Sequence, residues 1–419
     1  MGKSRLISID NFITTAVILF ILVYFSAYFN SDFLNTINNQ IQDFKFNDIV
    51  FSRLRNHETV EKDTNIVIVN IGNLQREGIT KEIDFINRYN PAVIGVDITF
   101  PREKSPEIDI ALAKSFLKVK NLVLASKLSS AGNDDEYNNV EKSIPLYTQY
   151  AKSGYVNFVD AEFRTAREFT PRVYIDQNEE LAFAVRVAQL FNPDAARKFL
   201  ARNNKREMIY YERNLNKYTV LDWDDILKIN NGNKTGETID TNNNILDNKY
   251  KHLISGRIVL LGFVGPELGS LSEEDNFYTP MNPQYIGKAY PDMYGVVVHA
   301  NIISMILNKK YINVMPDIWV TILIIILSYL TMAGFTYMRS RFEEAYEGLS
   351  LIFVFAEAFL FLGASLSLLY YFNYYLDLKT MFFVLAVSEM VSETYFGSLK
   401  PLTVNGFKKL AAGFAGKKN

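Results

Sequence analysis

The chain contains no cysteine among its 419 residues. It therefore cannot form disulfides, thiolate metal sites or a cysteine nucleophile. Only three histidines are present, His57, His252 and His299, and their separations do not fit a zinc site. The sequence predicts neither a bound metal nor a cofactor.

An excess of basic residues is also missing. Lysine and arginine number 44 against 46 acidic residues, which gives a net charge of −2 and argues against nucleic-acid binding. No G-x-S-x-G nucleophile elbow occurs. Three glycines after one predicted strand, Gly262, Gly265 and Gly269, match neither G-x-G-x-x-G nor a phosphate loop, so they indicate turns. We expect the protein not to be an enzyme.

Long apolar runs are what the chain does contain. Four of them cover residues 12–29, 318–338, 350–372 and 378–391. A membrane core about 30 Å thick requires roughly 20 apolar residues in a helix, so the first three are long enough and the fourth is marginal. The first run is longer than the apolar part of a secretory signal and no small-residue cleavage site follows it. We therefore expect a retained anchor and four transmembrane helices.

Basic residues beside these runs predict the orientation of the chain. They cluster before the first run, between the second and third, and after the fourth, with Lys309, Lys310 and Lys379 as exceptions. The predicted parts are a cytoplasmic start and first helix (1–29), an extracytoplasmic domain (30–317), three helices (318–396) and a basic cytoplasmic tail (397–419). A domain of this size outside the cytoplasm without disulfides is typical of a bacterial inner-membrane protein.

The predicted extracytoplasmic domain alternates strands and helices. β-Branched runs at 65–71, 92–98 and 122–125 are separated by helical patterns at 80–89 and 108–117. This alternation predicts right-handed βαβ units and an α/β domain with a mainly parallel or mixed sheet. A further buried strand is expected at 257–262 and a helix at 296–307. Residues 207–211 and 218–221 suggest a hairpin, and the Asn-rich segment 230–248 suggests a surface loop.

A series of short motifs carries a family resemblance. In chain order they are GVDITF (95–100), DIALA (109–113), GYVN (154–157), GRIVLLG (256–262), DNFYTP (275–280) and YGVVVHAN (294–301). This series resembles the second type of CHASE domain, a sensory extracellular module associated with cyclases and histidine kinases. Two features depart from the family: Gly72 and Asn73 replace an acidic pair that many members carry, and no enzymatic output domain follows residue 396. The resemblance implies a sensing unit that acts through a separate partner.

Candidate ligand-binding side chains follow the predicted strands and loops: Asp97, Asn157, Arg167, Asp275, Thr279 and His299. Asp97 ends a predicted parallel strand, where ligands bind in open α/β sheets. With Asp109 and Asp275 it could supply oxygen ligands to a hard cation, or it could instead cap a loop. Arg167 could contact an anion or pair with Asp160, and His299 is expected to bond a neighbouring loop.

Two acidic residues lie inside the predicted spans. Glu357 falls in the third and Glu389 near the end of the fourth. Carboxylates in a membrane face protein or water, so we expect hydrogen bonds to Ser388, Ser392 or a partner helix. These two glutamates are the predicted contact through which the protein is coupled to a partner.

Three functions remain open at this point. The first is a non-catalytic sensory or binding subunit that lies among membrane lipids and signals through a separate membrane or cytoplasmic effector, or through self-association. The second is a structural subunit of a bacterial envelope complex. The third is an enzyme centred on Asp97.

Overall fold

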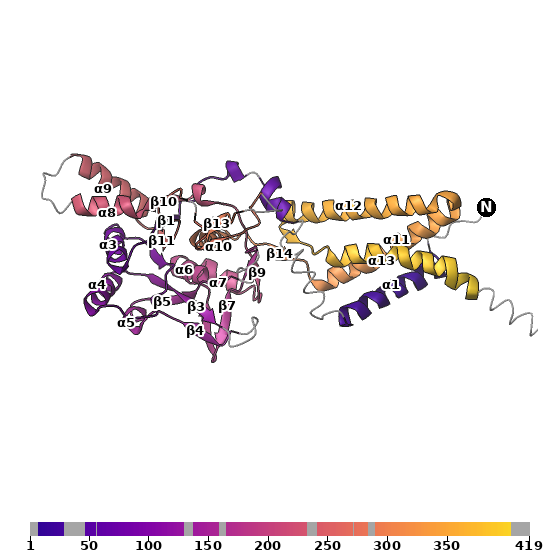
Figure 1. The fold of residues 1–419 in the computed structure, drawn as a ribbon, viewed down its shortest axis with the longest axis horizontal. Helices are drawn as coiled ribbons and strands as arrows, with labels where there is room; N and C mark the ends of the chain where they lie inside the picture. Colours follow the sequence, from indigo (N-terminus) through magenta and orange to yellow (C-terminus); the bar gives the residue numbers. More distant parts are fainter. Residues whose placement is uncertain are drawn as a thin grey trace, which may run out of the picture. The chain divides into compact units, whose positions relative to one another are not determined.

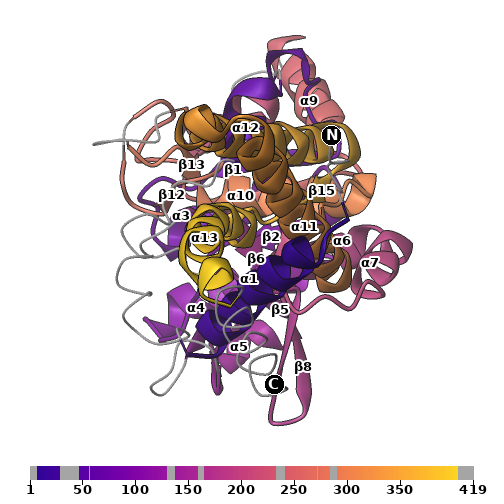
Figure 2. The same ribbon diagram turned by 90° about the vertical axis from the view of Figure 1, so that its right-hand side faces the viewer.

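The computed structural model describes residues 7–28, 47–55, 57–129, 137–158, 165–232, 241–270, 272–283 and 290–403. The chain divides into two compact units. The first comprises Met1–Asn47 with Asn313–Asn419, and the second comprises Asp48–Ile312. Figures 1 and 2 show the helices and strands of both units.

A seven-stranded mixed sheet forms the centre of the second unit. Its strands are β1 (Ile66–Asn70), β2 (Val93–Val96), β3 (Leu122–Ser129), β4 (Asn139–Glu141), β5 (Lys152–Tyr155), β10 (Thr219–Asp222) and β11 (Ile258–Gly262). The order is β10-β1-β11-β2-β3, and β3 also pairs with β4 and β5. Only the pairing of β3 with β4 is antiparallel. The predicted α/β class and mixed sheet are confirmed.

Helices cover both faces of this sheet. On one face lie α3 (Arg76–Asn87), α4 (Pro106–Leu117) and the start of α8 (Trp223–Gly232), whose apolar side chains share a core with β1, β2, β3 and β11. On the other lie α6 (Phe183–Phe191) and α10 (Gly295–Asn308) (Figure 1). Gly95 allows this close approach, because a Cβ there would lie 2.9 Å from Phe183. Every residue of β1 and β11 is buried, as expected for parallel strands covered on both sides.

Shorter elements surround the sheet. They are η1 (Val50–Leu54), η2 (His57–Thr59), α5 (Pro145–Thr148), β6 (Glu168–Phe169), β7 (Arg172–Ile175), β8 (Asn178–Leu181), α7 (Pro193–Leu200), β9 (Glu207–Met208), η3 (Leu215–Lys217), α9 (Thr241–Ile254), β12 (Asn276–Phe277) and β13 (Met293–Tyr294). Antiparallel pairs form between β6 and β9, β7 and β8, and β12 and β13.

Two expectations for the middle of the chain are wrong. Residues 207–211 and 218–221 do not form a hairpin, because β9 pairs with β6 while β10 joins the edge of the main sheet beside β1. The segment 230–248 is not one loop: α8 extends to Gly232 and α9 begins at Thr241, and residues 233–240 lie outside the described part. The end of α8 and the start of α9 are rich in asparagine, which is typical of loops, so the sequence pattern did not predict these helical residues.

The first unit is a group of four apolar helices. They are α1 (Ile9–Tyr28), α11 (Asp317–Arg341), α12 (Tyr346–Phe372) and α13 (Lys379–Thr394), which is followed by η5 (Tyr395–Leu399). Two candidate spans, Asp317–Arg341 and Glu343–Phe372, are long and apolar enough to cross a membrane. Two short strands pair in parallel in this unit: β14 (Asn313–Val314), which precedes α11, and β15 (Tyr374–Tyr375), which follows α12.

Polar side chains connect these helices to one another. Thr336 of α11 donates to Asn11 of α1 at 2.7 Å. Asp10 of α1 accepts from Tyr395 at 2.9 Å and from Lys400 at 2.6 Å. Hydrogen bonds as well as packing therefore connect α1 to α11 and to the segment that follows α13.

One buried acid in the second unit leads to a stability prediction. Glu82 on α3 is fully buried, and neither of its carboxyl oxygens has a hydrogen-bond partner within the described ranges. Burial, and secondarily the nearby Asp222, raises the pKa of Glu82 from 4.5 to about 9. An acid with a raised pKa holds its proton in the folded state, so the free energy of unfolding falls as pH rises from 4.5 to about 9.

We expect Glu82→Gln to remove most of this pH dependence, because glutamine stays neutral. Relative to the wild type, Tm of the variant should rise between pH 5 and pH 9 by at least roughly 2–4 °C, equivalent to about 1 kcal/mol. Glu77→Gln, at an exposed position of the same helix, is the control and should leave the slope unchanged. Parallel Tm curves for Glu82→Gln and the wild type would contradict the prediction.

Candidate functional site

Asp97 lies directly after β2 at the carboxyl end of the parallel sheet. Its backbone N–H donates to the carbonyl of Leu261 at 2.8 Å, which extends the pairing of β2 with β11 by one residue. The side chain is half-buried. Asp97 therefore occupies the edge where an open α/β sheet binds ligands.

Asp275 lies beside the first turn of α10. Its backbone is left-handed, with φ of 51°, and its carbonyl accepts from the N–H of Gly295 at 2.9 Å. A Cβ on Gly295 would lie 2.9 Å from a carboxyl oxygen of Asp275, so glycine provides the space that this carboxyl occupies. The amino-terminal end of a helix favours a negative charge.

The charge of Asp275 perturbs Asp97 electrostatically. Burial raises the pKa of Asp97 well above 3.8, and the charge of Asp275 raises it further. Loss of water around its carboxyl raises the pKa of Asp275 to about 7, although the residue as a whole is exposed. Lys127 of β3 lowers the pKa of both aspartates and so partly offsets their repulsion. We call Asp97, Asp275 and Lys127 together the acidic site.

His299 is a core residue. It is 3% exposed, and its ring lies 4.7 Å from that of Phe158 and 5.1 Å from that of Phe183, between centroids. Its Nδ1 has no hydrogen-bond partner among the residues that the structure describes, so the expected bond from this atom to a loop is not found. Burial lowers the pKa of His299 to about 3, which keeps the ring neutral at physiological pH.

Asn157 holds two strands together. Its side chain accepts from the N–H of Leu128 at 2.7 Å and donates to the carbonyl of the same residue at 3.1 Å. Both ends of the amide are therefore engaged by the backbone of β3. Asn157 therefore contributes to the shape of this end of the sheet.

Arg167 and Thr279 are engaged with acidic side chains that the sequence analysis did not single out. Arg167 forms a buried ion pair with Asp48, with Nη2 and Oδ2 2.5 Å apart. Thr279 donates from its hydroxyl to Asp292 at 2.6 Å and from its N–H at 2.7 Å. The proposed alternative partner of Arg167, Asp160, lies outside the described residues.

Asp109, the third candidate cation ligand, does not join the acidic site. It pairs with Arg76 and accepts from the hydroxyl of Tyr147 at 2.9 Å and the N–H of Lys104 at 2.7 Å. Although burial raises its pKa, these hydrogen bonds hold the pKa of Asp109 below 3.8. Among the described residues, no group of three or more metal-binding side chains could hold an ion.

A side chain at the end of β1 holds the loop that follows β11 in place by hydrogen bonds. Asn70 at the end of β1 accepts from the N–H of Val264 at 2.8 Å and donates to the carbonyl of Gly265 and to Asp222. Gly265 and Gly269 have φ of 102° and 87°, a conformation that glycine adopts without strain. The N–H of Val264 is thus used internally, and the glycines support turns as the sequence suggested.

Glu357 and Glu389, on the apolar helices α12 and α13, contact other helices of the same chain. Thr331 of α11 donates to both carboxyl oxygens of Glu357 at 3.2 and 3.0 Å. Ser350 of α12 donates to Glu389 at 2.9 Å. Of the alternatives suggested by the sequence, bonds to another helix are found. Bonds to the two serines are not, because Ser388 donates to a carbonyl of its own helix and Ser392 pairs with Tyr346.

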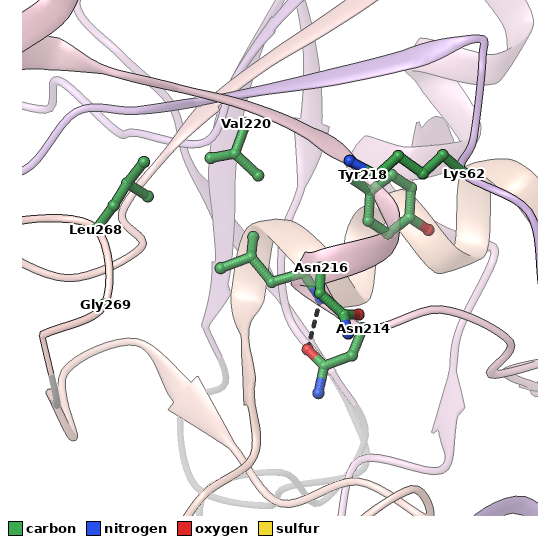
Figure 3. A pocket seen from close by; sticks show the side chains of 8 residues that line it. Lys62, Asn214, Asn216, Tyr218, Val220, Leu268 and Gly269 are labelled. Carbon is green, nitrogen blue, oxygen red and sulfur yellow. Dashed lines mark hydrogen bonds between the residues drawn. The ribbon is translucent and has the colours of Figure 1, made fainter. Parts of the chain in front are cut away.

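A cavity of about 610 Å³ lies elsewhere in the second unit. It is lined by Lys62, Asn214, Leu215, Asn216, Tyr218, Val220, Leu268 and Gly269 (Figure 3). None of the six predicted ligand-binding residues lines it. The predicted set is thus divided: Asp97 and Asp275 are neighbours, and the other four have structural contacts.

Comparison with known proteins gives one match. Residues 15–333, most of the chain, match the family model of the CHASE2 domain. No curated protein and no solved structure matches.

The acidic site predicts a pH-dependent effect of removing one charge. Because the pKa of Asp97 is raised in the folded state, its protonation stabilises the fold at low pH, and this stabilisation is lost as pH rises. We expect Asp97→Asn to raise Tm at pH 8 by roughly 2–4 °C, about 1 kcal/mol, with a smaller gain at pH 4. Asp176→Asn, in an exposed turn, should have no effect. A lower Tm for Asp97→Asn at pH 8 would contradict this account.

Proposed function

Because the chain belongs to the CHASE2 family, whose members are extracellular sensory domains, we propose that it is a non-catalytic sensory subunit in the bacterial inner membrane. In this proposal the second unit lies outside the cytoplasm and binds a ligand or an envelope protein. The membrane helices pass the response to a separate effector or to another copy of the chain.

The acidic site is the observation that supports ligand binding most directly. Two aspartates with raised pKa values lie near each other at the carboxyl edge of the sheet. Such an arrangement costs folding free energy, and perturbed carboxyl groups of this kind gather at functional sites. Lys127 offsets only part of the negative charge, so the two carboxyl groups favour a ligand that carries a positive charge or hydrogen-bond donors.

A second candidate is a structural subunit of an envelope complex. Asn157, Arg167 and Thr279 are engaged in contacts within the fold. Because these side chains bond within the fold, the six predicted ligand-binding residues do not form one small-molecule pocket. This favours a surface that binds another protein. Ligand-induced changes in Tm that depend on Asp97 would distinguish sensing from this alternative.

We further propose that all four helices of the first unit cross the membrane, with both termini in the cytoplasm. Basic side chains, among them Arg339, Arg341 and Lys400, support this orientation. The contacts of Asp10 with Tyr395 and Lys400 support placing the start of α1 and the end of α13 on the same side.

Single-cysteine labelling tests this topology without background, because the chain has no cysteine. With the outer membrane permeabilised, Ser129→Cys and Asp377→Cys should react with a membrane-impermeant maleimide in whole cells. Ile7→Cys, Ser340→Cys and Thr403→Cys should react only after the inner membrane is opened. The wild-type chain is the control. Labelling of Ile7→Cys or Thr403→Cys in whole cells would remove α1 or α13 from the set of spans.

The partner contact is expected near the intramembrane glutamates. Glu357 is half-buried on α12, whose outer surface exposes Leu351, Ile352, Phe355 and Phe359. Replacing Glu357 and Glu389 together by leucine should weaken association with the partner or second copy while Tm of the second unit stays unchanged. Gentle extraction from the native membrane followed by mass spectrometry measures that association.

Ser367→Leu is the matched control for this experiment, because it replaces an exposed polar side chain on α12. It should leave the association intact. If the wild-type protein is monomeric and carries no partner after mild extraction, the proposed coupling through these helices is wrong.

A further inference from the structure

Strand β10 is one edge of the main sheet. It pairs with β1 on one side, and within the described ranges no strand pairs with its other side. In a strand, every second residue directs its N–H and C=O outward, and no backbone hydrogen bond beyond those to β1 involves Thr219–Asp222 among the described residues. Such an edge is a template for one more strand.

The cavity of about 610 Å³ adjoins this strand, because Val220 of β10 and the preceding Tyr218 line it. Figure 3 shows Val220 between Leu268 and Gly269 on one side and Tyr218 and Lys62 on the other. Tyr218 is buried, while Leu268 is 40% exposed at the rim. The edge therefore combines backbone groups for strand pairing with an apolar hollow for a side chain.

Lys62 is the only charged side chain among the eight residues that line the hollow, and it lies at one end. Lys62 lines the hollow at the same end as Tyr218 (Figure 3), and it has no ion-pair partner within the part of the chain that the structure describes. Because Tyr218 directly precedes β10, this cation marks the amino-terminal end of the strand. A carboxylate would find its only matching charge in the lining at that end.

We propose that β10 and this hollow bind an extended peptide of another protein by strand addition. The four residues of β10 span about 13 Å, which accommodates three or four residues of an added strand. An apolar side chain of the peptide enters the hollow between Leu215, Val220 and Leu268, and a carboxylate near its carboxyl end pairs with Lys62.

The added strand is antiparallel. An antiparallel edge strand is common on otherwise parallel α/β sheets, and this direction places the carboxyl end of the peptide beside Lys62. In strand addition the backbone hydrogen bonds supply affinity and side-chain pockets supply selectivity. The binding surface is separate from the acidic site, so failure of this proposal leaves the proposed sensory function intact.

The test uses the full chain in nanodiscs of phosphatidylcholine and a fluorescein-labelled hexapeptide. The probe has alternating threonines, with valine and leucine between them and glutamate at its carboxyl end. Fluorescence anisotropy should show saturable binding. Two N-methylated versions of the peptide carry the methyl groups on one or the other alternating set of backbone nitrogens. The version whose methyl groups face β10 should bind at least tenfold more weakly, because it cannot donate hydrogen bonds to that strand.

Matched variants separate the two parts of the surface. Leu268→Arg should weaken binding at least tenfold, whereas Ile110→Arg, at an exposed apolar position on α4, should not. Lys62→Glu should reverse the preference from the glutamate-ended probe to a lysine-ended one, and Lys114→Glu, exposed on α4, should leave it unchanged.

Three results would overturn the proposal. The first is no saturable binding at millimolar probe, and the second is equal binding of both methylated versions and the unmethylated peptide. The third is that the protein forms a dimer which Leu268→Arg dissociates and which excludes the probe, because the edge would then pair with a second copy of this chain.

Discussion

Burial of β1 and β11 on both faces determines where this domain can interact with anything else. All ten residues of these two strands are buried, with α3 and α4 on one side and α6 and α10 on the other. A parallel sheet covered in this way presents only its strand ends and its two lateral edges. The acidic site lies at the carboxyl end of the sheet and the peptide-sized hollow lies along one edge. Both candidate surfaces are thus where the architecture leaves backbone or side chains accessible.

The buried ionisable side chains of the second unit are of two kinds: those that have an ion-pair or hydrogen-bond partner among the described residues, and those that do not. Arg167 with Asp48 and Arg76 with Asp109 are compensated ion pairs, and removing one partner of such a pair leaves an unpaired buried charge. His299 avoids the problem by remaining neutral. Glu82 and the Asp97–Asp275 pair are different, because folding raises their pKa values without matching hydrogen bonds or cations sufficient to prevent it. Of these acids, only Asp97 and Asp275 lie at the carboxyl end of the parallel strands, where open α/β sheets bind ligands. They are therefore the functional candidates.

The sequence predicted the elements of the fold better than it predicted the contacts between side chains. β-Branched runs identified β1, β2, β3 and β11 because burial on both faces requires continuous apolar residues. The same signal could not place β10, whose short mixed sequence does not reveal that it pairs with β1. Asp97 was identifiable from its position after a strand. The partners of Arg167 and Thr279 were not, because Asp48 lies 119 residues away from Arg167 and Asp292 lies 13 residues after Thr279.

The apolar helices of the first unit show the same difference between what the sequence predicts and what packing determines. Apolar length predicted the helices, but an apolar run does not indicate which neighbouring helix it contacts. The specific contacts are polar: Thr331 with Glu357, Ser350 with Glu389, and Thr336 with Asn11. Each joins a different pair of helices. A carboxyl group that already has an internal partner can exchange it for one on another protein with little change in the number of hydrogen bonds. That exchange is a physical basis by which binding within the membrane could alter the packing of α12 against α11 and α13.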